Sequence, residues 1–136
     1  MRKIICLLIL IAITAGCGTF HSIEQQRGKG LKKVYNYSYK DVYMAAVRSI
    51  NSLQLFMLKN SEKEGYIYAT EGSRWSWGEK IAIYINKIGE DTTEVEILTG
   101  KILVPLAMPS ATIWEKDILL EIDRKLGDAF LLGKKQ

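Results

Sequence analysis

The alternation of apolar and polar residues along the second half of the chain predicts a β-sheet. From Leu55 onward, four short segments rich in β-branched and aromatic residues are separated by polar, glycine-containing stretches; they read LFMLK, YIYATEG, KIAIYINKIG and TTEVEILTG. Their spacing predicts an antiparallel meander. We expect one apolar face, formed by Ile81, Ile83, Ile85, Val95 and Ile97, and one solvated face, with Ala82, Tyr84, Asn86, Glu94 and Glu96.

A fifth strand is predicted ahead of these four, over Val34 to Tyr39. Its period-2 pattern places Tyr35, Tyr37 and Tyr39 on one face. This tyrosine stripe either packs on the sheet or forms an exposed aromatic surface for a ligand.

Two helices are predicted, one before and one after the meander. Ser38 and Asp41 have the spacing of a capping box ahead of the sequence DVYMAAVRSINSL, in which apolar residues recur every three or four positions. The second helix covers about Ser110 to Phe130, after Pro109 and with Ser110 or Thr112 as the cap; its apolar stripe is Trp114, Ile118, Ile122 and Leu126. Together these elements predict a two-layer α+β domain, an antiparallel β-meander of four to five strands with two helices packed on one face.

The first 17 residues have the organisation of an export signal. Arg2 and Lys3 precede an uncharged apolar block from Ile4 to Ile13, which is shorter than the roughly 20 residues that span a membrane as a helix. The block ends at Ala15-Gly16-Cys17, which resembles the lipobox of bacterial lipoproteins. Without a lipid, Cys17 would be a small residue after a conventional cleavage site, or a free thiol.

The resemblance implies a mature chain that begins at Cys17 and is held in a membrane by diacylglycerol on that cysteine. Lipoproteins kept at an inner membrane usually carry Asp after the cysteine, whereas this chain has Gly18. An outer-membrane anchor with the domain in the periplasm is therefore implied, or the outer face of the cell membrane in an organism with one membrane. The predicted organisation is a removed signal over 1–16, a flexible tether over 17–33, a single domain over 34–130 and a C-terminal tail over 131–136.

Charge and cysteine content add little to this picture. The formal charge of +4 falls to +2 once Arg2 and Lys3 are removed, which gives no argument for nucleic acid binding. Basic residues concentrate at 27–33 and 134–135, where they are solvated tails or are attracted to anionic lipid headgroups. Because Cys6 lies in the signal and Cys17 is the lipidation site, no disulfide is expected.

Catalytic and metal-binding patterns are scarce. His21 is the only histidine and lies in the predicted tether, so we expect neither a metal site nor a catalytic relay, and no cofactor. Glu94 and Glu96 point the same way on a predicted strand, but a solvated strand face explains them, and the same holds for the acids of the last helix, Asp117, Glu121, Asp123 and Asp128. The sequence therefore predicts a protein that is not an enzyme.

Two segments are candidates for binding. Arg74, Trp75 and Trp77 lie in or beside a predicted hairpin turn and belong to the residue types enriched at binding hot spots, although the tryptophans can also simply cover the sheet. The apolar segment Lys101 to Ser110, with Pro105 and Pro109, is either a buried edge strand or an exposed patch for a partner.

We predict a binding or accessory module for another envelope component. The alternatives are a carrier or sensor of a small apolar ligand held between helices and sheet, and a hydrolase with a desolvated carboxyl group.

Overall fold

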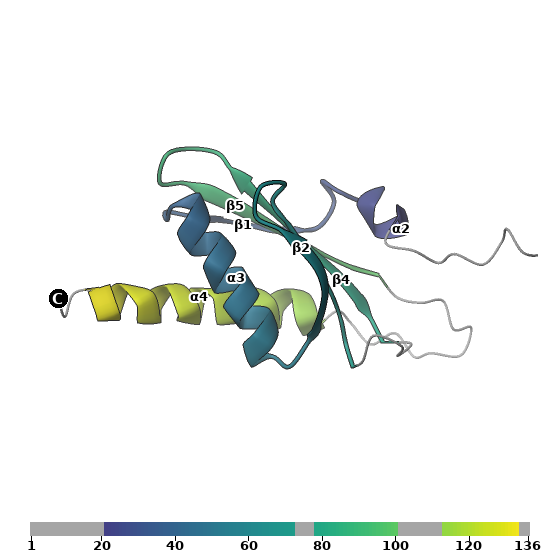
Figure 1. Cartoon of the computed structure of the whole chain (residues 1–136). Coiled ribbons are helices and arrows are strands. Elements are labelled where there is room, and N and C mark those ends of the chain that lie inside the picture. Colours follow the sequence, from purple (N-terminus) through teal and green to yellow (C-terminus); the bar gives the residue numbers. More distant parts are fainter. Residues whose placement is uncertain (1–20, 73–77, 101–112, 134–136) are drawn as a thin grey trace, which may run out of the picture.

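The computed structural model describes residues 21–72, 78–100 and 113–133. Figure 1 shows the arrangement of the elements. The helices are α2 (His21–Glu24), α3 (Tyr39–Ser52) and α4 (Ile113–Gly133), and the strands are β1 (Leu31–Tyr35), β2 (Phe56–Ser61), β3 (Tyr66–Thr70), β4 (Lys80–Lys87) and β5 (Thr93–Gly100).

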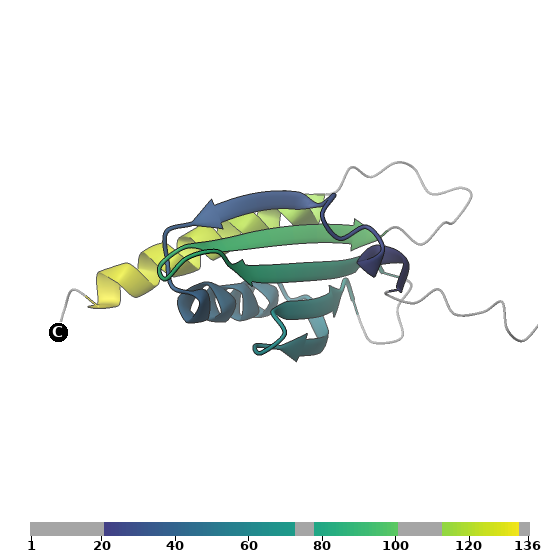
Figure 2. The ribbon, with the colours of Figure 1, turned by 90° about the horizontal axis from the view of Figure 1, so that it is seen from above.

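The five strands form one antiparallel sheet in the order β1-β5-β4-β3-β2, seen from above in Figure 2. The meander from β2 to β5 is confirmed, and β1 joins it beside β5, with Leu31 opposite Ile97 and Tyr35 opposite Thr93. The register of β2 against β3 shifts between Met57 and Lys59, which marks a β-bulge.

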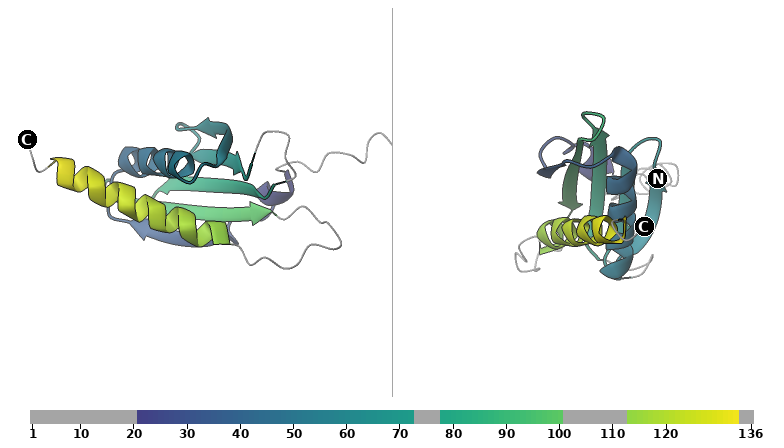
Figure 3. Two further views of the ribbon diagram at one scale, coloured as in Figure 1. Left: turned by 90° about the horizontal axis from the view of Figure 1, so that it is seen from below. Right: turned by 90° about the vertical axis from the view of Figure 1, so that its left-hand side faces the viewer.

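Helices α3 and α4 pack on the same face of the sheet and against each other, as the view from below in Figure 3 shows. The core between the two layers contains the predicted sheet residues and the predicted stripe of the last helix, with Trp114 partly buried at its margin. The α+β architecture with two helices on one face is thus confirmed. Seven isoleucines of this core are completely buried, so side chains fill the layer in which a carrier would hold its ligand: Ile50, Ile67, Ile81, Ile83, Ile97, Ile118 and Ile122.

The start of α3 agrees with the predicted cap. Ser38 is the N-cap, and its side chain accepts a hydrogen bond from the backbone N–H of Asp41 at 3.3 Å. The Ser38 hydroxyl also donates to the Asp41 carboxylate at 2.7 Å. The carboxylate therefore orients the capping hydroxyl and lies at the positive end of the helix.

Replacing Ser38 with alanine is expected to lower the free energy of unfolding by about 1 kcal/mol, because one N–H of the first turn of α3 loses its acceptor. Chemical denaturation measures the change. Ser38→Thr is the control, since threonine keeps the oxygen and should retain most of the stability; an equal loss in both variants would argue against the cap.

The predicted strand over 34–39 is wrong in its boundaries. β1 ends at Tyr35, and α3 begins at Tyr39, because the cap at Ser38 turns the chain before a longer strand can form. Tyr35 is buried in the core, whereas Tyr37 and Tyr39 pack at its margin. The three tyrosines therefore do not share a strand face.

The predicted flexible tether over 17–33 is wrong from residue 21 onward. α2 covers His21–Glu24, β1 begins at Leu31, and Ile23 of α2 is 3% exposed. The folded part thus begins before residue 34, because this segment supplies an apolar side chain and a strand to the sheet. At the other end, α4 continues to Gly133, into the predicted tail, since Leu131 and Leu132 favour helix.

Within the described ranges, no helix combines the length and apolarity needed to cross a bilayer.

Candidate functional site

The sheet face opposite α3 and α4 is partly covered by residues 21–30, and we call it the N-terminal face. Its apolar cluster consists of Ile23, Tyr68, Ala82, Tyr84 and Leu98, with Tyr66 at the margin. The prediction of a solvated face is therefore wrong. Ile23 lies so close to Gly100 that a Cβ atom at position 100 would be 2.6 Å from Ile23 Cδ1, which shows how tightly the segment packs on the end of β5.

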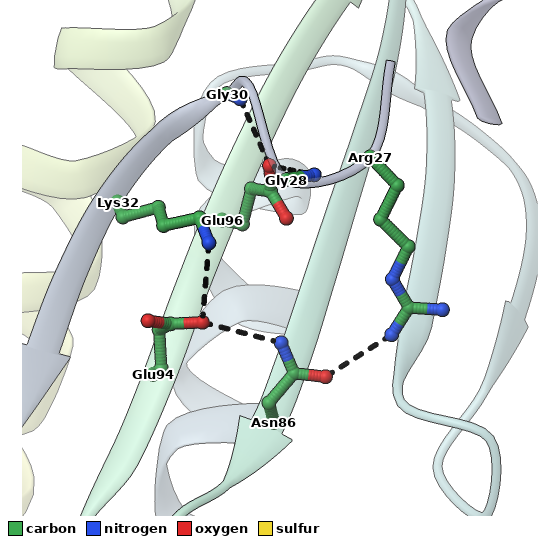
Figure 4. A network of polar contacts seen from close by, with 7 residues as sticks. All are labelled: Arg27, Gly28, Gly30, Lys32, Asn86, Glu94 and Glu96. Atoms are coloured by element: carbon green, nitrogen blue, oxygen red, sulfur yellow. Dashed lines mark hydrogen bonds and ion pairs between the residues drawn. The ribbon is translucent and has the colours of Figure 1, made fainter. Parts of the chain in front are cut away.

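Glu96 fastens this segment to the sheet (Figure 4). Its side chain is 1% exposed, and Oε1 accepts hydrogen bonds from the backbone N–H of Gly28 at 2.6 Å and of Gly30 at 2.8 Å. Gly28 has φ +97°, and a Cβ atom at Gly30 would lie 2.5 Å from the carbonyl oxygen of Ile97. Both glycines are therefore needed for the backbone to approach the carboxylate. The sequence-based prediction of a solvated Glu96 is wrong, because a buried carboxylate is satisfied by backbone donors here.

A second set of polar contacts runs along the rim of the same face and is also drawn in Figure 4. Arg27 donates to Asn86 at 3.1 Å, and Asn86 donates to Glu94 at 3.4 Å. Lys32 Nζ lies 3.9 Å from Glu94 Oε1, and the Arg27 guanidinium lies 4.5 Å from the centre of the Tyr84 ring. Glu94 is only partly buried, so the two glutamates, although neighbours on β5, have different environments.

The tyrosines under α2 form a third group of contacts. The Tyr68 hydroxyl donates to Glu24 Oε1 at 2.6 Å and lies 3.3 Å from the Tyr84 hydroxyl, while the Tyr66 and Tyr68 rings stack with centroids 4.8 Å apart. Burial, followed by the hydrogen bonds to Glu24 and Tyr84, raises the pKa of Tyr68 well above its ordinary value. The phenol is therefore held in its neutral form while α2 covers it.

The stability of the domain is expected to fall as pH rises above about 10. A Tyr whose pKa is raised in the folded state stabilises fully below its unfolded pKa of about 10, and this contribution is lost at higher pH by at most about 1.4 kcal/mol per pH unit. Urea denaturation at pH 8, 10 and 11 measures the slope, which Tyr68→Phe should make shallower. An unchanged slope would contradict the burial of this phenol; Tyr37→Phe is the matched control.

Two acids of α4 that were predicted to be merely solvated, Glu121 and Asp123, form ion pairs. Lys33 Nζ contacts both carboxylate oxygens of Asp123, at 2.6 and 2.7 Å, and so joins β1 to α4. Arg124 pairs with Glu121 and lowers the pKa of that carboxyl to about 2, with Lys125 as a further partner. The contact of Lys33 connects two elements of the fold, whereas the pairs of Glu121 lie within α4, and these contacts do not converge on a site.

A shallow open depression of about 370 Å³ lies at the turn between β2 and β3. Its lining residues are Tyr39, Lys63, Glu64, Gly65, Ile85, Asn86 and Lys87. Gly65 has φ +71°, its carbonyl accepts from the Ile85 N–H at 2.8 Å, and the Tyr39 hydroxyl donates to the Glu62 carbonyl. The depression is thus formed by backbone packing at a turn.

The remaining predicted site residues lie outside the described residues. These are the lipidation residue Cys17, the binding residues Arg74, Trp75 and Trp77, and the segment with Pro105 and Pro109. His21 is the first residue of α2. In the part of the chain that the structure describes, no group of three or more His, Cys, Asp or Glu residues is placed to hold a metal ion.

Chemically, the N-terminal face is arranged to hold a chain segment in place. Glu96 is the desolvated acid that a carboxylate-dependent hydrolase would require, but one of its oxygens accepts two backbone N–H groups and residues 21–30 cover it. Sequence reasoning missed this role. The available signals were the two glycines at 28 and 30 and the uncharged residues Ala82, Tyr84 and Leu98 on the face predicted to be solvated.

Comparison with known families gives one match. A family model described as "Protein of unknown function (DUF3568)" matches residues 4–102, well over half of the chain. The chain belongs to the DUF3568 family. None of the curated proteins matches it. The part shared with DUF3568 runs from the apolar leader through β5 and thus includes Glu96 and the two glycines that it binds.

Proposed function

We propose that this DUF3568 protein is a lipid-anchored lipoprotein of the bacterial envelope and a non-enzymatic binding or accessory module for another envelope component. The proposed anchor is diacylglycerol on Cys17, with the domain in the periplasm at the outer membrane, or on the outer face of the cell membrane where there is only one. The observation that carries the proposal is the sequence Ala15-Gly16-Cys17 after a short apolar block.

The fold supports the proposal in one respect. The chain after Cys17 packs on the sheet from α2 onward, through Ile23 and the hydrogen bonds of Glu96. A pull on the N-terminus is therefore transmitted to the middle of the domain, which suits a protein held by that end.

Lipidation is tested by expressing the full chain in bacteria fed an alkyne-labelled fatty acid, followed by mass spectrometry of the N-terminal peptide. We expect an acylated peptide that begins at Cys17, and accumulation of the uncleaved form when lipoprotein signal peptidase is inhibited. Cys17→Ser should abolish the label, whereas Cys6→Ser should keep it. A soluble, unmodified mature chain would overturn the proposal of a lipid anchor.

The binding role is tested by crosslinking in cells. Alanine at both Trp75 and Trp77 should remove a reproducible crosslinked partner while the domain stays folded, as circular dichroism would report. Ile88→Ala, which truncates an exposed apolar residue on the β4–β5 turn, is the control and should keep the partner. If the partner remains after loss of both tryptophans, Trp75 and Trp77 are not the binding site.

A further inference from the structure

We infer that the N-terminal face lies against the anionic phospholipid headgroups of the bilayer that holds Cys17. This inference rests on the proposed lipid anchor and names the surface that the anchored domain presents to the membrane. It commits to one partner, the bilayer surface.

The first argument is the short distance between the anchor and the docked chain. His21 begins α2 and lies four positions after Cys17, and four residue steps span at most about 14 Å. Ile23, two residues further, is buried on the end of β5. The N-terminal face is thus held close to the headgroups, within a distance similar to the Debye length of about 10 Å.

The second argument is the charge of this face. Residues opposite each other in an antiparallel sheet share a face, which places Lys32 with Glu96, Lys59 with Tyr68, and Lys80 with Thr70. The basic residues of the face are Arg27, Lys29, Lys32, Lys59 and Lys80, and its acidic residues are Glu24, Glu94 and Glu96, with Glu64 near Lys59 at the edge. Four of the cations, Arg27, Lys29, Lys32 and Lys59, are exposed. Glu96 is buried under the docked segment and Glu94 is partly buried, so the exposed cations outnumber the exposed acids, Glu24 and Glu64.

The opposite layer has no excess of cations, because Lys33 of β1, which contacts Asp123, only brings its basic residues level with its acidic ones. Among their described lengths, α3 and α4 carry six acidic residues, Asp41, Glu115, Asp117, Glu121, Asp123 and Asp128, against five basic ones, Lys40, Arg48, Lys116, Arg124 and Lys125. Anionic lipids attract basic side chains over about a Debye length, so this asymmetry favours the N-terminal face as the side toward the bilayer.

The third argument is the pair of aromatic rings at the β2 edge of the same face. Phe56 lies opposite Thr70 and is 41% exposed, and the Lys59 ammonium lies 5.3 Å from the centre of the Tyr66 ring. Aromatic side chains beside basic ones are typical of protein surfaces at the level of lipid headgroups. Lys59, with Phe56 beside it, therefore extends the basic surface of residues 27–32 across the sheet.

The orientation is tested on the acylated full-length protein in vesicles of phosphatidylethanolamine with 30% phosphatidylglycerol. A fluorescent amino acid at Gln26, on the N-terminal face, or at Met44, on the exposed side of α3, reports quenching by headgroup spin-labelled lipid. We expect quenching at 26 to exceed that at 44 severalfold, and to weaken in 0.5 M salt or in pure phosphatidylcholine.

A charge-reversed variant sharpens the test. K29E/K32E/K59E should lower the quenching at position 26 severalfold, whereas the matched variant K40E/R48E/K116E on the helices should leave it unchanged. Equal quenching at both positions, or an equal effect of both variants, would overturn the inference. If Cys17 is acylated but the two positions are quenched equally, only this inference fails. If Cys17 is not acylated, the proposed anchor fails. Quenching of the unacylated protein at position 26 alone would still support binding of the N-terminal face to anionic lipid.

Discussion

Replacing Glu96 with alanine is expected to lower the free energy of unfolding by about 3 kcal/mol, because two backbone N–H groups lose a charged acceptor in a covered site. The affected donors are those of Gly28 and Gly30. Urea denaturation measures the loss. Hydrogen exchange of these two amides should accelerate, and trypsin should cleave after Arg27 and Lys29 much faster than in the wild-type protein.

Glu94→Ala is the matched control for this experiment. Glu94 lies on the same strand and the same face, but it is partly exposed and its ion pair with Lys32 spans 3.9 Å. Its loss should cost less than about 1 kcal/mol, as is usual for surface pairs. Similar losses for both glutamates, or unchanged protection of residues 28 and 30, would show that the carboxylate does not hold the segment.

Truncating Ile83 to alanine is expected to destabilise the domain by about 4 kcal/mol, since it opens a cavity in a closely packed core. Ile83 lies between Ile67 and Ile97 in a row across the sheet, and all three residues are 0% exposed under the helices. The midpoint of urea denaturation should fall while its slope stays unchanged.

The control for the core is Ile88→Ala. Ile88 follows β4 directly but is 58% exposed, so its truncation should change the free energy of unfolding by less than about 0.5 kcal/mol. A loss below about 1 kcal/mol at Ile83 would contradict the packing of α3 and α4 over the centre of the sheet.

The elements that the sequence predicted correctly have strong local patterns. Alternating isoleucines in β4 and the apolar stripe of α4 each bury one side of a regular element, and the cap at Ser38 depends on residues three positions apart. Such signals are short-range, so they can be interpreted from a single sequence. The antiparallel meander with two helices on one face follows from them directly.

The N-terminal face could not be predicted in the same way, because its chemistry depends on contacts between distant residues. Glu96 and Gly30 are 66 positions apart, and a glutamate on an alternating strand usually indicates solvent. Residues 21–30 have no periodicity of their own and gain structure by packing on the sheet and by the hydrogen bonds with Glu96. The segment therefore resembles a linker in sequence although it is part of the fold.

The position of β1 beside β5 also has a consequence for the order of folding. A ribosome releases the chain N-terminus first, so β1 is available some 60 residues before its partner strand. The three β-hairpins from β2 to β5 involve short loops and can close early, whereas the contact of β1 with β5 closes the longest loop in the sheet. Until then the edge of β5 has unpaired backbone groups that can pair with another chain, so the late arrival of this contact leaves a newly made chain exposed to aggregation.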